Sequence, residues 1–445
     1  MLNPAEVSLA VRDPALPGLR LLLDNERLGE WLSDLLGREV VIRRRHLRYK
    51  PGTSCVLHAE GAGQPLLVSA YRPADSAKLG KTCKQAPAGT VVGVDVPLGV
   101  LVSTLAADRD LVALAVLPDE SRRQLLLDRM LGEGAVLPGA EPEMLRYKPH
   151  RRWVGLLPTT SGPVLLRAYR RTAITSAAQA VSRLQDGAPR TPRLLGWDRR
   201  LGLAAVEFLA GRPAHDPTVA DTTAYADAAV FGRVGAALAR LHQRSGVRLP
   251  ERRPAADIAA VCAATEHLSV LLPELARSVT RLADRIAEGL NRVDPPPVLV
   301  HGDFSADQAV VHRDGQVALI DLDSAVLGDP AADLGCAAAA MARDVVLGEL
   351  TEPARTDRLV ALHAGYREAG GLLDSDRMRW HDAAHLLRRA AEPFRLGLTT
   401  DWPQAARDLV QAADSALSEP ALSEPALSEP ALSEPVRSKP SMGRN

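Results

Sequence analysis

Three polar side chains in the last third of the chain have the types and spacing of a metal-dependent site. Asp303 stands in a His-Gly-Asp loop, Gln308 follows five residues later, and Asp321 comes directly after the next apolar run. Oxygen atoms of carboxylates and side-chain amides are the ligands that magnesium prefers in proteins. We therefore expect a divalent cation to bind where these residues meet.

A predicted β-hairpin brings two of them together. The dipeptide Asp314-Gly315 separates two apolar runs rich in β-branched residues, which predicts a two-residue turn with positive φ angles. If Arg313 faces Gln316 across that turn, Gln308 lies opposite Asp321. Directly opposed residues have Cβ atoms roughly 5 Å apart, so this register would let both side chains hold one metal ion.

The segment 301–335 resembles the catalytic core of a known family. It contains HGDxxxxQ, then IDxD, then GDPxxDLG, a pattern similar to that of the aminoglycoside phosphotransferases and choline kinases, small-molecule relatives of the protein kinases. The protein-kinase catalytic loop has the same five-residue spacing between its Asp and its amide. The resemblance implies that Asp303 is the catalytic base and that Gln308 and Asp321 bind Mg²⁺. Most of the family has Asn where this chain has Gln308, and the maltokinase-like branch is similar to this chain in having Gln.

Three further acidic residues follow Asp321 in the sequence. Asp323 lies two residues after Asp321 and shares its face if the strand continues, so it helps to hold a second magnesium ion or holds only the loop. Asp329 precedes a Pro-led helix, which is typical of an N-cap. We expect structural roles for Asp329 and Asp333, and likewise for His242.

The first half of the chain contains an internal repeat. Residues 47–72 align without a gap with residues 145–170, and 11 of the 26 aligned positions are identical. The repeat begins with the sequence Leu-Arg-Tyr-Lys-Pro in both copies. Two copies are too few for a solenoid, so we expect a duplicated β-rich lobe.

The second copy has the order of elements of a kinase small lobe. In such a lobe the third strand carries a cation that pairs with the nucleotide phosphates, and the resemblance places Arg167 there, with Lys148, Arg151 and Arg152 as competing cations. Arginine binds phosphate oxygens well through its planar fork. The first copy has Ser69 at the position of Arg167. We therefore expect the first copy to be a degenerate cap and the second to bind ATP.

Two more features of the small lobe follow from the resemblance. The helix over residues 172–185 offers only Gln179 where a kinase presents an acid to the cation, and a surface glutamine is an equally good interpretation. The segment from Glu207 to Leu209 falls where a kinase hinge binds adenine through backbone groups.

The predicted fold class is α+β, a bilobal protein-kinase-like fold with a small antiparallel-sheet N-lobe and a mostly helical C-lobe, preceded by the degenerate cap. We expect the cap at 1–134, the ATP-binding N-lobe and hinge at 135–212, and the helical catalytic C-lobe at 213–415. In the C-lobe, apolar periodicity predicts helices that include 225–242 and 376–396. Residues 416–435 are four copies of Ala-Leu-Ser-Glu-Pro, and a proline at every fifth position predicts that the tail 416–445 is disordered.

Composition excludes several classes of function. Lysine plus arginine equals aspartate plus glutamate at 54 each in 445 residues, so no overall charge favours nucleic acid or an acidic membrane surface. The four cysteines have no metal-binding spacing, which favours a reducing, cytoplasmic location. No uninterrupted apolar run approaches the length of a membrane span.

These features together predict an ATP- and Mg²⁺-dependent phosphotransferase that moves the γ-phosphoryl group to a hydroxyl of a small polar molecule. Gln308 and the extra lobe favour a sugar as the acceptor. An aminoglycoside is the competing acceptor, because Glu392 and Asp401 could make the cleft acidic; His381 and His385 lie in the same region. The alternative is a nucleotide-binding pseudokinase that regulates a partner protein, favoured by Arg167 and Gln179. The oligomeric state stays open.

Overall fold

The computed structural model describes residues 2–215 and 228–418. The predicted disordered tail, apart from its first three residues, and the start of the helix predicted at Tyr225 lie outside the described residues. None of the described helices is both long and apolar enough to cross a membrane.

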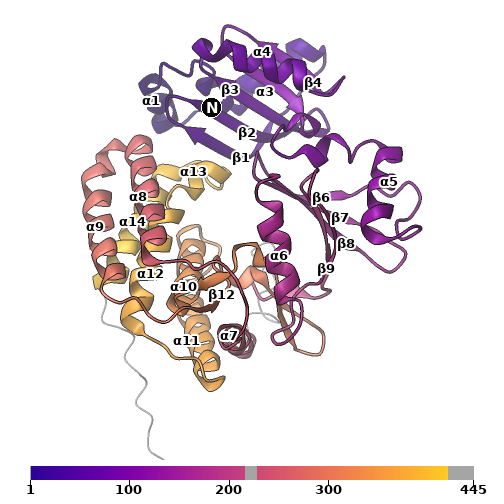
Figure 1. The fold of residues 1–445 in the computed structure, drawn as a ribbon. Coiled ribbons are helices and arrows are strands. Elements are labelled where there is room, and N and C mark those ends of the chain that lie inside the picture. The colour runs from indigo at the N-terminus through magenta and orange to yellow at the C-terminus, as the bar shows by residue number, and fades with distance from the viewer. Residues whose placement is uncertain (1, 216–227, 419–445) are drawn as a thin grey trace, which may run out of the picture.

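Two antiparallel sheets of five strands make up the first half of the molecule (Figure 1). The first has the order β1-β2-β3-β5-β4, and the second has the order β6-β7-β8-β10-β9, so the strands of the two sheets correspond one to one. This correspondence confirms the duplicated lobe. The strands are β1 (Arg43–Lys50), β2 (Ser54–Gly61), β3 (Gln64–Tyr71), β4 (Val91–Asp95), β5 (Val100–Thr104), β6 (Glu143–Lys148), β7 (Arg152–Leu157), β8 (Val164–Tyr169), β9 (Leu194–Asp198) and β10 (Leu203–Glu207).

The two lobes share details that the strand order alone does not require. The Tyr49 hydroxyl donates to Asp13 at 2.7 Å, and the Tyr147 hydroxyl donates to Asp108 at 2.7 Å. In each lobe the same aspartate also accepts a backbone N–H from the turn that follows the first strand. A buried tyrosine needs a partner for its hydroxyl, so the repeated Leu-Arg-Tyr-Lys-Pro sequence builds the same anchor twice.

Helices flank both sheets. Helix α3 begins after Asp24, whose side chain accepts the Arg27 N–H at 3.3 Å, and it ends at Gly37, which is in the left-handed conformation (φ 63°). The helices of this half are α1 (Pro4–Arg12), α2 (Leu19–Leu23), α3 (Asn25–Leu36), α4 (Ser76–Gln85), α5 (Glu120–Leu131) and α6 (Ile174–Leu184).

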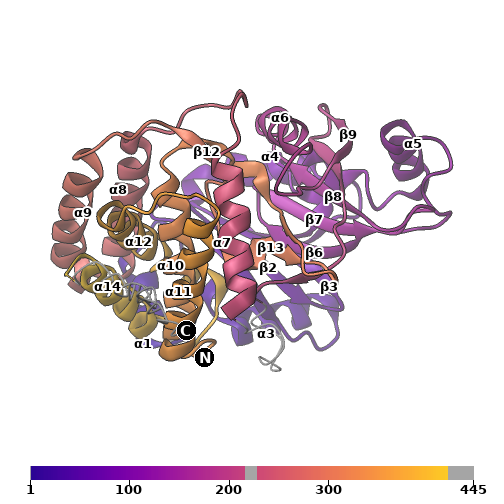
Figure 2. The ribbon, with the colours of Figure 1, turned by 90° about the horizontal axis from the view of Figure 1, so that it is seen from below.

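The second half is mostly helical, which confirms the bilobal α+β fold (Figure 2). Its short strands form two small antiparallel sheets, β11-β13-β14 and β12-β15. The elements are β11 (Arg212–Pro213), α7 (Ala228–His242), α8 (Pro254–Leu271), α9 (Ala276–Asn291), β12 (Val298–Val300), β13 (Ala309–Val311), β14 (Val317–Leu319), β15 (Val326–Gly328), α10 (Pro330–Val346), α11 (Glu352–Glu368), α12 (Ser375–Arg389), α13 (Glu392–Leu396) and α14 (Trp402–Ser418).

One predicted helix is two helices. The segment 376–396 divides into α12 and α13, with Ala390 and Ala391 between them. Pro393 stands in the first turn of α13, where the N–H that proline lacks would have no partner inside the helix. The prediction of a single helix was therefore wrong, because an apolar pattern can continue through a break at proline.

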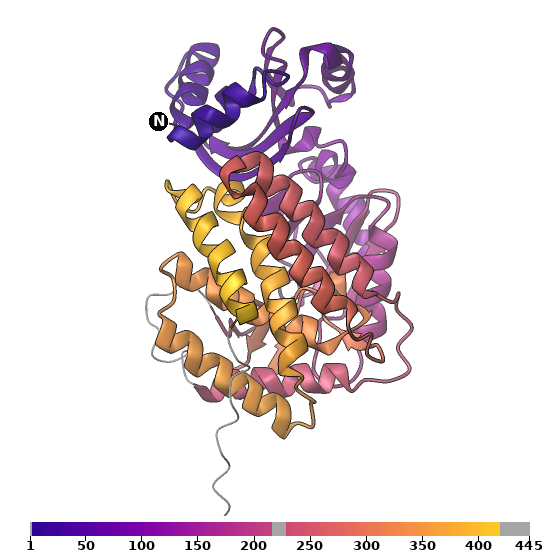
Figure 3. The same ribbon diagram turned by 90° about the vertical axis from the view of Figure 1, so that its left-hand side faces the viewer.

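The cap packs firmly against the helical lobe (Figure 3). Buried side chains of the first sheet, such as Leu47, belong to the same hydrophobic cluster as Leu268 of α8 and Phe394 of α13. The Tyr49 ring lies with its edge towards Phe394, at 6.5 Å between ring centroids. This shared core fixes β1, the edge strand of the cap, over α8 and α13. β1 therefore forms a rigid wall of any cavity between the cap and the helical lobe.

Candidate active site

The catalytic hairpin has a different register from the predicted one. Ala309 pairs with Leu319 and Val311 with Val317, so Gln308 lies opposite Ile320 and not opposite Asp321. The loop has three residues, 313–315, closed by hydrogen bonds between His312 and Gln316 and between Gly315 and His312, each 2.9 Å long. Gly315 has φ 81°, as expected where the last residue of a three-residue hairpin loop is left-handed. The predicted two-residue turn was therefore wrong by one residue.

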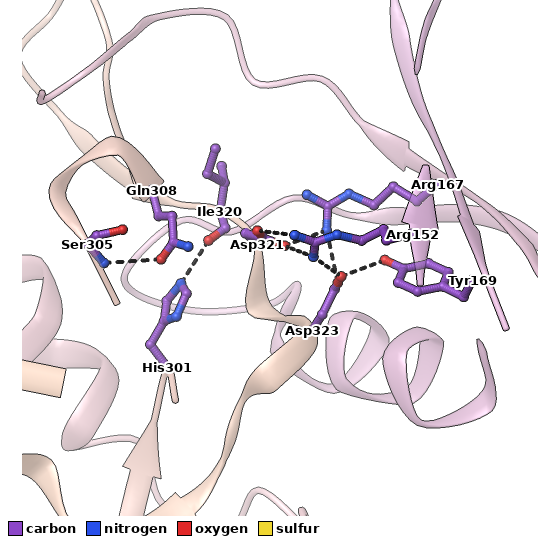
Figure 4. A network of polar contacts seen from close by, with 9 residues as sticks. All are labelled: Arg152, Arg167, Tyr169, His301, Ser305, Gln308, Ile320, Asp321 and Asp323. Carbon is purple, nitrogen blue, oxygen red and sulfur yellow. Dashed lines mark hydrogen bonds and ion pairs between the residues drawn. The ribbon is translucent and has the colours of Figure 1, made fainter. Parts of the chain in front are cut away.

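Gln308 and Asp321 nevertheless line the same cavity, although they are not opposite each other in the hairpin. Gln308 ends a short 3-10 helix, Ala306–Gln308, and its Oε1 accepts the Ser305 N–H at 3.2 Å. Asp321 follows β14 in the left-handed conformation (φ 63°), which aspartate tolerates better than most residues. Both side chains line one cavity together with Asp303, and Figure 4 shows Gln308 and Asp321 on neighbouring segments.

The loop that carries Asp303 is held by a buried network. The Asp333 carboxylate accepts the backbone N–H groups of His301 at 2.6 Å and Gly302 at 2.8 Å, and it contacts His242 Nε2 at 3.0 Å. Burial alone would raise the pKa of Asp333, but its hydrogen bond with His242 outweighs burial and lowers that pKa. The structural roles predicted for Asp333 and His242 are confirmed by these contacts.

A close backbone approach also fixes the Asp303 loop. Gly302 has φ 83°, and a Cβ atom there would lie 2.2 Å from the carbonyl oxygen of Ser324. His301 Nε2 donates to the Ile320 carbonyl at 2.8 Å (Figure 4). The loops that carry Asp303 and Asp321 are thus tied to each other through their backbones, whereas the Asp303 carboxylate itself is exposed.

Two arginines from the second lobe hold Asp321 and Asp323 (Figure 4). Arg152 donates to both oxygens of Asp321, at 2.7 and 3.1 Å, and to Asp323 at 2.7 Å. Arg167 donates to Asp321 at 3.0 Å and to Asp323 at 2.9 Å. Burial alone would raise the pKa of Asp321, but the positive charges of Arg167 and Arg152 outweigh it and hold that pKa below its ordinary value.

This cluster puts Arg167 where its strand position predicted, with an unexpected partner. Gln179 is exposed on α6, so it is a surface residue and does not pair with the cation. The acidic partners are Asp321 and Asp323, and the Tyr169 hydroxyl donates to Asp323 at 2.8 Å. Arg152 contacts Asp321 and Asp323 as closely as Arg167 does. The sequence analysis named Arg152 only as one of three competing cations.

A large cavity of about 1030 Å³ contains half of the predicted site residues. Asp303, Gln308, Asp321 and Lys148 line it, whereas Arg167 and Asp323 do not. Among the described residues no three or more His, Cys, Asp or Glu side chains are grouped so that they could hold a metal by themselves. Gln308 and Asp321 fit magnesium in another way, because this ion is commonly bound by one or two protein oxygens together with substrate phosphates and water.

The predicted hinge lies outside this cavity. The Glu207 carboxylate accepts Arg190 at 2.9 Å and the Arg193 N–H at 3.1 Å, and Leu209 is buried. The backbone N–H of Glu207 is engaged as well, because it donates to the Arg193 carbonyl at 2.9 Å. The assignment of Glu207 and Leu209 to nucleotide binding stays a prediction.

The residues proposed for an acidic acceptor cleft already have other interaction partners. Glu392 lies in the cavity wall but within 3.4–3.6 Å of the guanidinium groups of three arginines, Arg343, Arg389 and Arg395. Asp401 caps α14, and His381 contacts Asp329 at 3.2 Å. Asp329 also accepts the Ala331 N–H at 2.8 Å, which confirms that it is the N-cap of α10.

Sequence reasoning missed one wall of the cavity. His46, Arg48 and Lys50 of β1 line it, although they belong to the cap. They are the equivalents of Met144, Arg146 and Lys148 in the second copy, so the repeat itself was the signal that could have revealed them.

Comparisons with known proteins identify the family of this chain. The family model described as "Phosphotransferase enzyme family" matches residues 153–381, which is about half of the chain. A search of curated proteins finds no match. Among solved structures, an aminoglycoside phosphotransferase from Streptomyces rimosus is 22% identical, with 63% of this chain and 98% of that chain covered and a TM-score of 0.45.

Two other solved structures are similar to the same extent. A macrolide 2'-phosphotransferase from Brachybacterium faecium is 19% identical, with 68% of this chain and 99% of that chain covered and a TM-score of 0.40. A choline/ethanolamine kinase family protein from Mesorhizobium loti is 18% identical, with 63% and 90% covered and a TM-score of 0.45. The family match carries the assignment: this chain belongs to the phosphotransferase enzyme family and is a small-molecule phosphotransferase.

Proposed function

We propose that the protein transfers the γ-phosphoryl group of ATP to a hydroxyl of a small polar molecule. The observation that carries this proposal is the convergence of Asp303, Gln308 and Asp321 on one cavity that Lys148 and Arg152 also line. Phosphoryl transfer requires mainly alignment of donor and acceptor and neutralisation of charge, and it needs no covalent nucleophile. A free carboxylate, a metal-binding pair and fixed cations are suited to those tasks.

Gln308 and Asp321 would hold Mg²⁺, which supplies charge neutralisation at the phosphates when it is bound. Asp323 is fully engaged by Arg152, Arg167 and Tyr169 and lies outside the cavity. Its role in this proposal is to position the two arginines, which is neither the second magnesium site nor the support of the loop that the sequence analysis considered.

Two sets of partners compete for Arg152 and Arg167: the carboxylates of Asp321 and Asp323, and the phosphates of a nucleotide. Arg152 donates to both oxygens of Asp321, the same oxygens that would bind magnesium. Phosphate oxygens are strong acceptors for guanidinium groups, so nucleotide binding gives Arg152 and Arg167 new partners and leaves Asp321 free. The cluster therefore couples release of the metal ligand to arrival of the phosphates.

Asp303 acts as the base of the reaction. Its carboxylate is exposed to the cavity, while the loop that carries it is fixed by Asp333 and by the His301–Ile320 hydrogen bond. A rigid backbone and an accessible carboxylate are what a positioned proton acceptor needs. It would take the hydroxyl proton as the acceptor oxygen bonds to phosphorus.

Consumption of ATP with Mg²⁺ against a panel of sugars, aminoglycosides and nucleosides tests the proposal. We expect Asp303→Asn to reduce acceptor-dependent turnover by at least a hundredfold, in line with the usual contribution of general base catalysis. Asp314→Asn, at the exposed tip of the catalytic hairpin, is the matched control and should retain turnover. Nucleotide binding without turnover on any acceptor would favour a pseudokinase, and full turnover by Asp303→Asn would refute the base assignment.

A further inference from the structure

The charge of the cavity is far from that of the whole chain. Ten arginine and lysine side chains line the cavity, against six of aspartate and glutamate, whereas the chain as a whole has a formal net charge of zero. Three of the six acids, Asp321, Asp344 and Glu392, are already paired with arginines. These pairs engage four of the ten cations, so six cations remain against three acids, Glu266, Asp303 and Asp307, that have no ion pair among the described residues.

Six of the cations have no ion pair with a carboxylate among the described residues. They come from all three parts of the molecule: Arg48 and Lys50 of β1, Arg146 and Lys148 of β6, Arg151 of the following turn, and Arg388 of α12. Arg388 Nη1 lies 3.4 Å from the imidazole Nδ1 of His385. Unpaired cations gathered in a concave site attract anions, because the low-dielectric walls focus their field.

The edge strands of the two lobes present this charge on equivalent faces. His46, Arg48 and Lys50 alternate along β1, and Arg146 and Lys148 alternate along β6, so each set lies on one face of its strand. Both sets line the same cavity. Burial lowers the pKa of His46 to about 3, helped by Arg395, Lys148, Arg146 and Arg151, all of them positive.

The nucleotide accounts for only part of this charge. Lys148 and Arg152 line the cavity and can meet the triphosphate, and Arg167, which donates to Asp321 from outside the cavity, is assigned to the phosphates by the proposed function. Arg48 belongs to the cap and Arg388 to the helical lobe, on elements that carry none of the predicted nucleotide or metal ligands. Their charge is available to the second substrate.

We propose that the acceptor is itself an anion, a hydroxyl compound that carries a phosphate or carboxylate group, and that Arg48 of the cap and Arg388 of α12 bind this group. The inference rests on the proposed phosphoryl transfer and narrows its acceptor. It excludes polycationic aminoglycosides, whose amino groups would meet the unpaired cations. It also gives the cap a task, since one wall of the acceptor site is the first strand of the degenerate lobe.

Calorimetric titration of the full-length protein, saturated with Mg²⁺ and a non-hydrolysable ATP analogue, tests the proposal. The probes are glucose 6-phosphate, glucuronate, glucose and kanamycin. We expect at least one of the two anionic sugars to bind tenfold or more tightly than glucose, and kanamycin not to bind. Comparison of glucose 6-phosphate with glucuronate tells a phosphate group from a carboxylate.

Matched variants locate the anion. Arg48→Ala and Arg388→Ala should each weaken binding of the preferred anionic sugar about tenfold and leave the affinity for the nucleotide analogue unchanged. Arg199→Ala, an exposed arginine in the turn between β9 and β10, is the control and should change neither affinity. Equal binding of glucose and both anions, binding of kanamycin, or an equal loss of nucleotide affinity in the two variants would overturn the proposal.

The two levels of inference fail separately. Mg²⁺-dependent phosphorylation of glucose or kanamycin without any preference for an anion would refute the anionic acceptor and leave phosphoryl transfer intact. Tight binding of an anionic sugar that is never phosphorylated, with no ATP consumed on any acceptor, would refute phosphoryl transfer and leave the anion site in place.

Discussion

The two β-lobes have the same frame and differ in charge at the two positions that contact Asp321 and Asp323 in the second lobe. Each sheet has five strands in corresponding order, and each anchors the tyrosine of its first strand to a buried aspartate at 2.7 Å. The differences lie at Arg152 and Arg167, which correspond to Ser54 and Ser69 in the cap. Those two arginines are the ones that hold Asp321 and Asp323. A lobe can thus keep its architecture and lose its ligand chemistry through two side chains.

The comparison also shows what the cap has kept. Lys50 and Arg48 are identical to their equivalents Lys148 and Arg146, and all four line the cavity. The second lobe combines a cationic first strand with the two arginines of its second and third strands, whereas the cap retains only the first strand. We infer that the cap supplies a wall of the substrate site and does not bind nucleotide.

The largest effect is expected when the arginine pair is removed. Arg152→Ala combined with Arg167→Ala should weaken binding of the ATP analogue by at least a hundredfold, because each charge-assisted contact to phosphate contributes about 1.5–3 kcal/mol. Calorimetric titration measures this affinity. Ser54→Ala combined with Ser69→Ala is the matched control in the cap, and an equal loss in that variant would mean that the wrong lobe was assigned to the nucleotide.

The tyrosine anchors should contribute to stability in both lobes. Asp13→Ala and Asp108→Ala each leave a buried tyrosine hydroxyl without its acceptor, which costs about 1–3 kcal/mol of the free energy of unfolding. Asp108 also contacts His150 Nδ1 at 2.8 Å, so we expect the larger loss there. The midpoint of thermal unfolding measures both, and a loss confined to one lobe would contradict the equivalence of the anchors.

Lys148 gives the second lobe a dependence on pH that an arginine would not show. Burial, then the charges of Arg146 and Arg152, lowers the pKa of Lys148 to about 8, against the weaker opposing effect of Asp303 and Asp321. Lys148 in the free protein therefore loses its charge as the pH rises through about 8. We expect nucleotide affinity to fall severalfold between pH 7 and pH 9 and to fall less in Lys148→Arg. Parallel loss in both proteins would exclude Lys148 as a phosphate ligand.

The smallest effect is expected at the equivalent lysine of the cap. Lys50 is exposed, and the cap lacks both arginines, so Lys50→Ala should leave nucleotide affinity within twofold of the unchanged protein. The same titration measures it beside Lys148→Ala, which should weaken binding. A larger loss with Lys50→Ala than with Lys148→Ala would reverse the roles of the two copies.

Much of the fold follows from local signals in the sequence. The repeat identifies the two lobes because eleven of the 26 aligned positions are identical in the two copies. Asp329 before a proline and Asp24 before an amphipathic run predict helix starts, since capping depends on the residue and its immediate neighbours. The prediction that failed was also based on a local signal. The hairpin loop has three residues and not two, because Gly315 is compatible with either turn geometry.

The site could be predicted only in part. The resemblance correctly brought Asp303, Gln308 and Asp321 to one cavity, although the register offered as the reason was wrong. It could not show that Arg152 reaches Asp321, because 169 residues separate them and only the packing of the lobes brings them together. The contribution of Arg48 and Lys50 of the cap to the cavity could not be predicted for the same reason.

The most direct test of the whole account is the effect of Mg²⁺ on binding of a non-hydrolysable ATP analogue to the unchanged protein and to Asp321→Asn. If Asp321 exchanges its arginines for the metal when phosphates arrive, Mg²⁺ should tighten binding to the unchanged protein at least tenfold and have little effect on the variant. If Mg²⁺ tightens binding equally in both proteins, Asp321 is not a metal ligand and the proposed site is wrong.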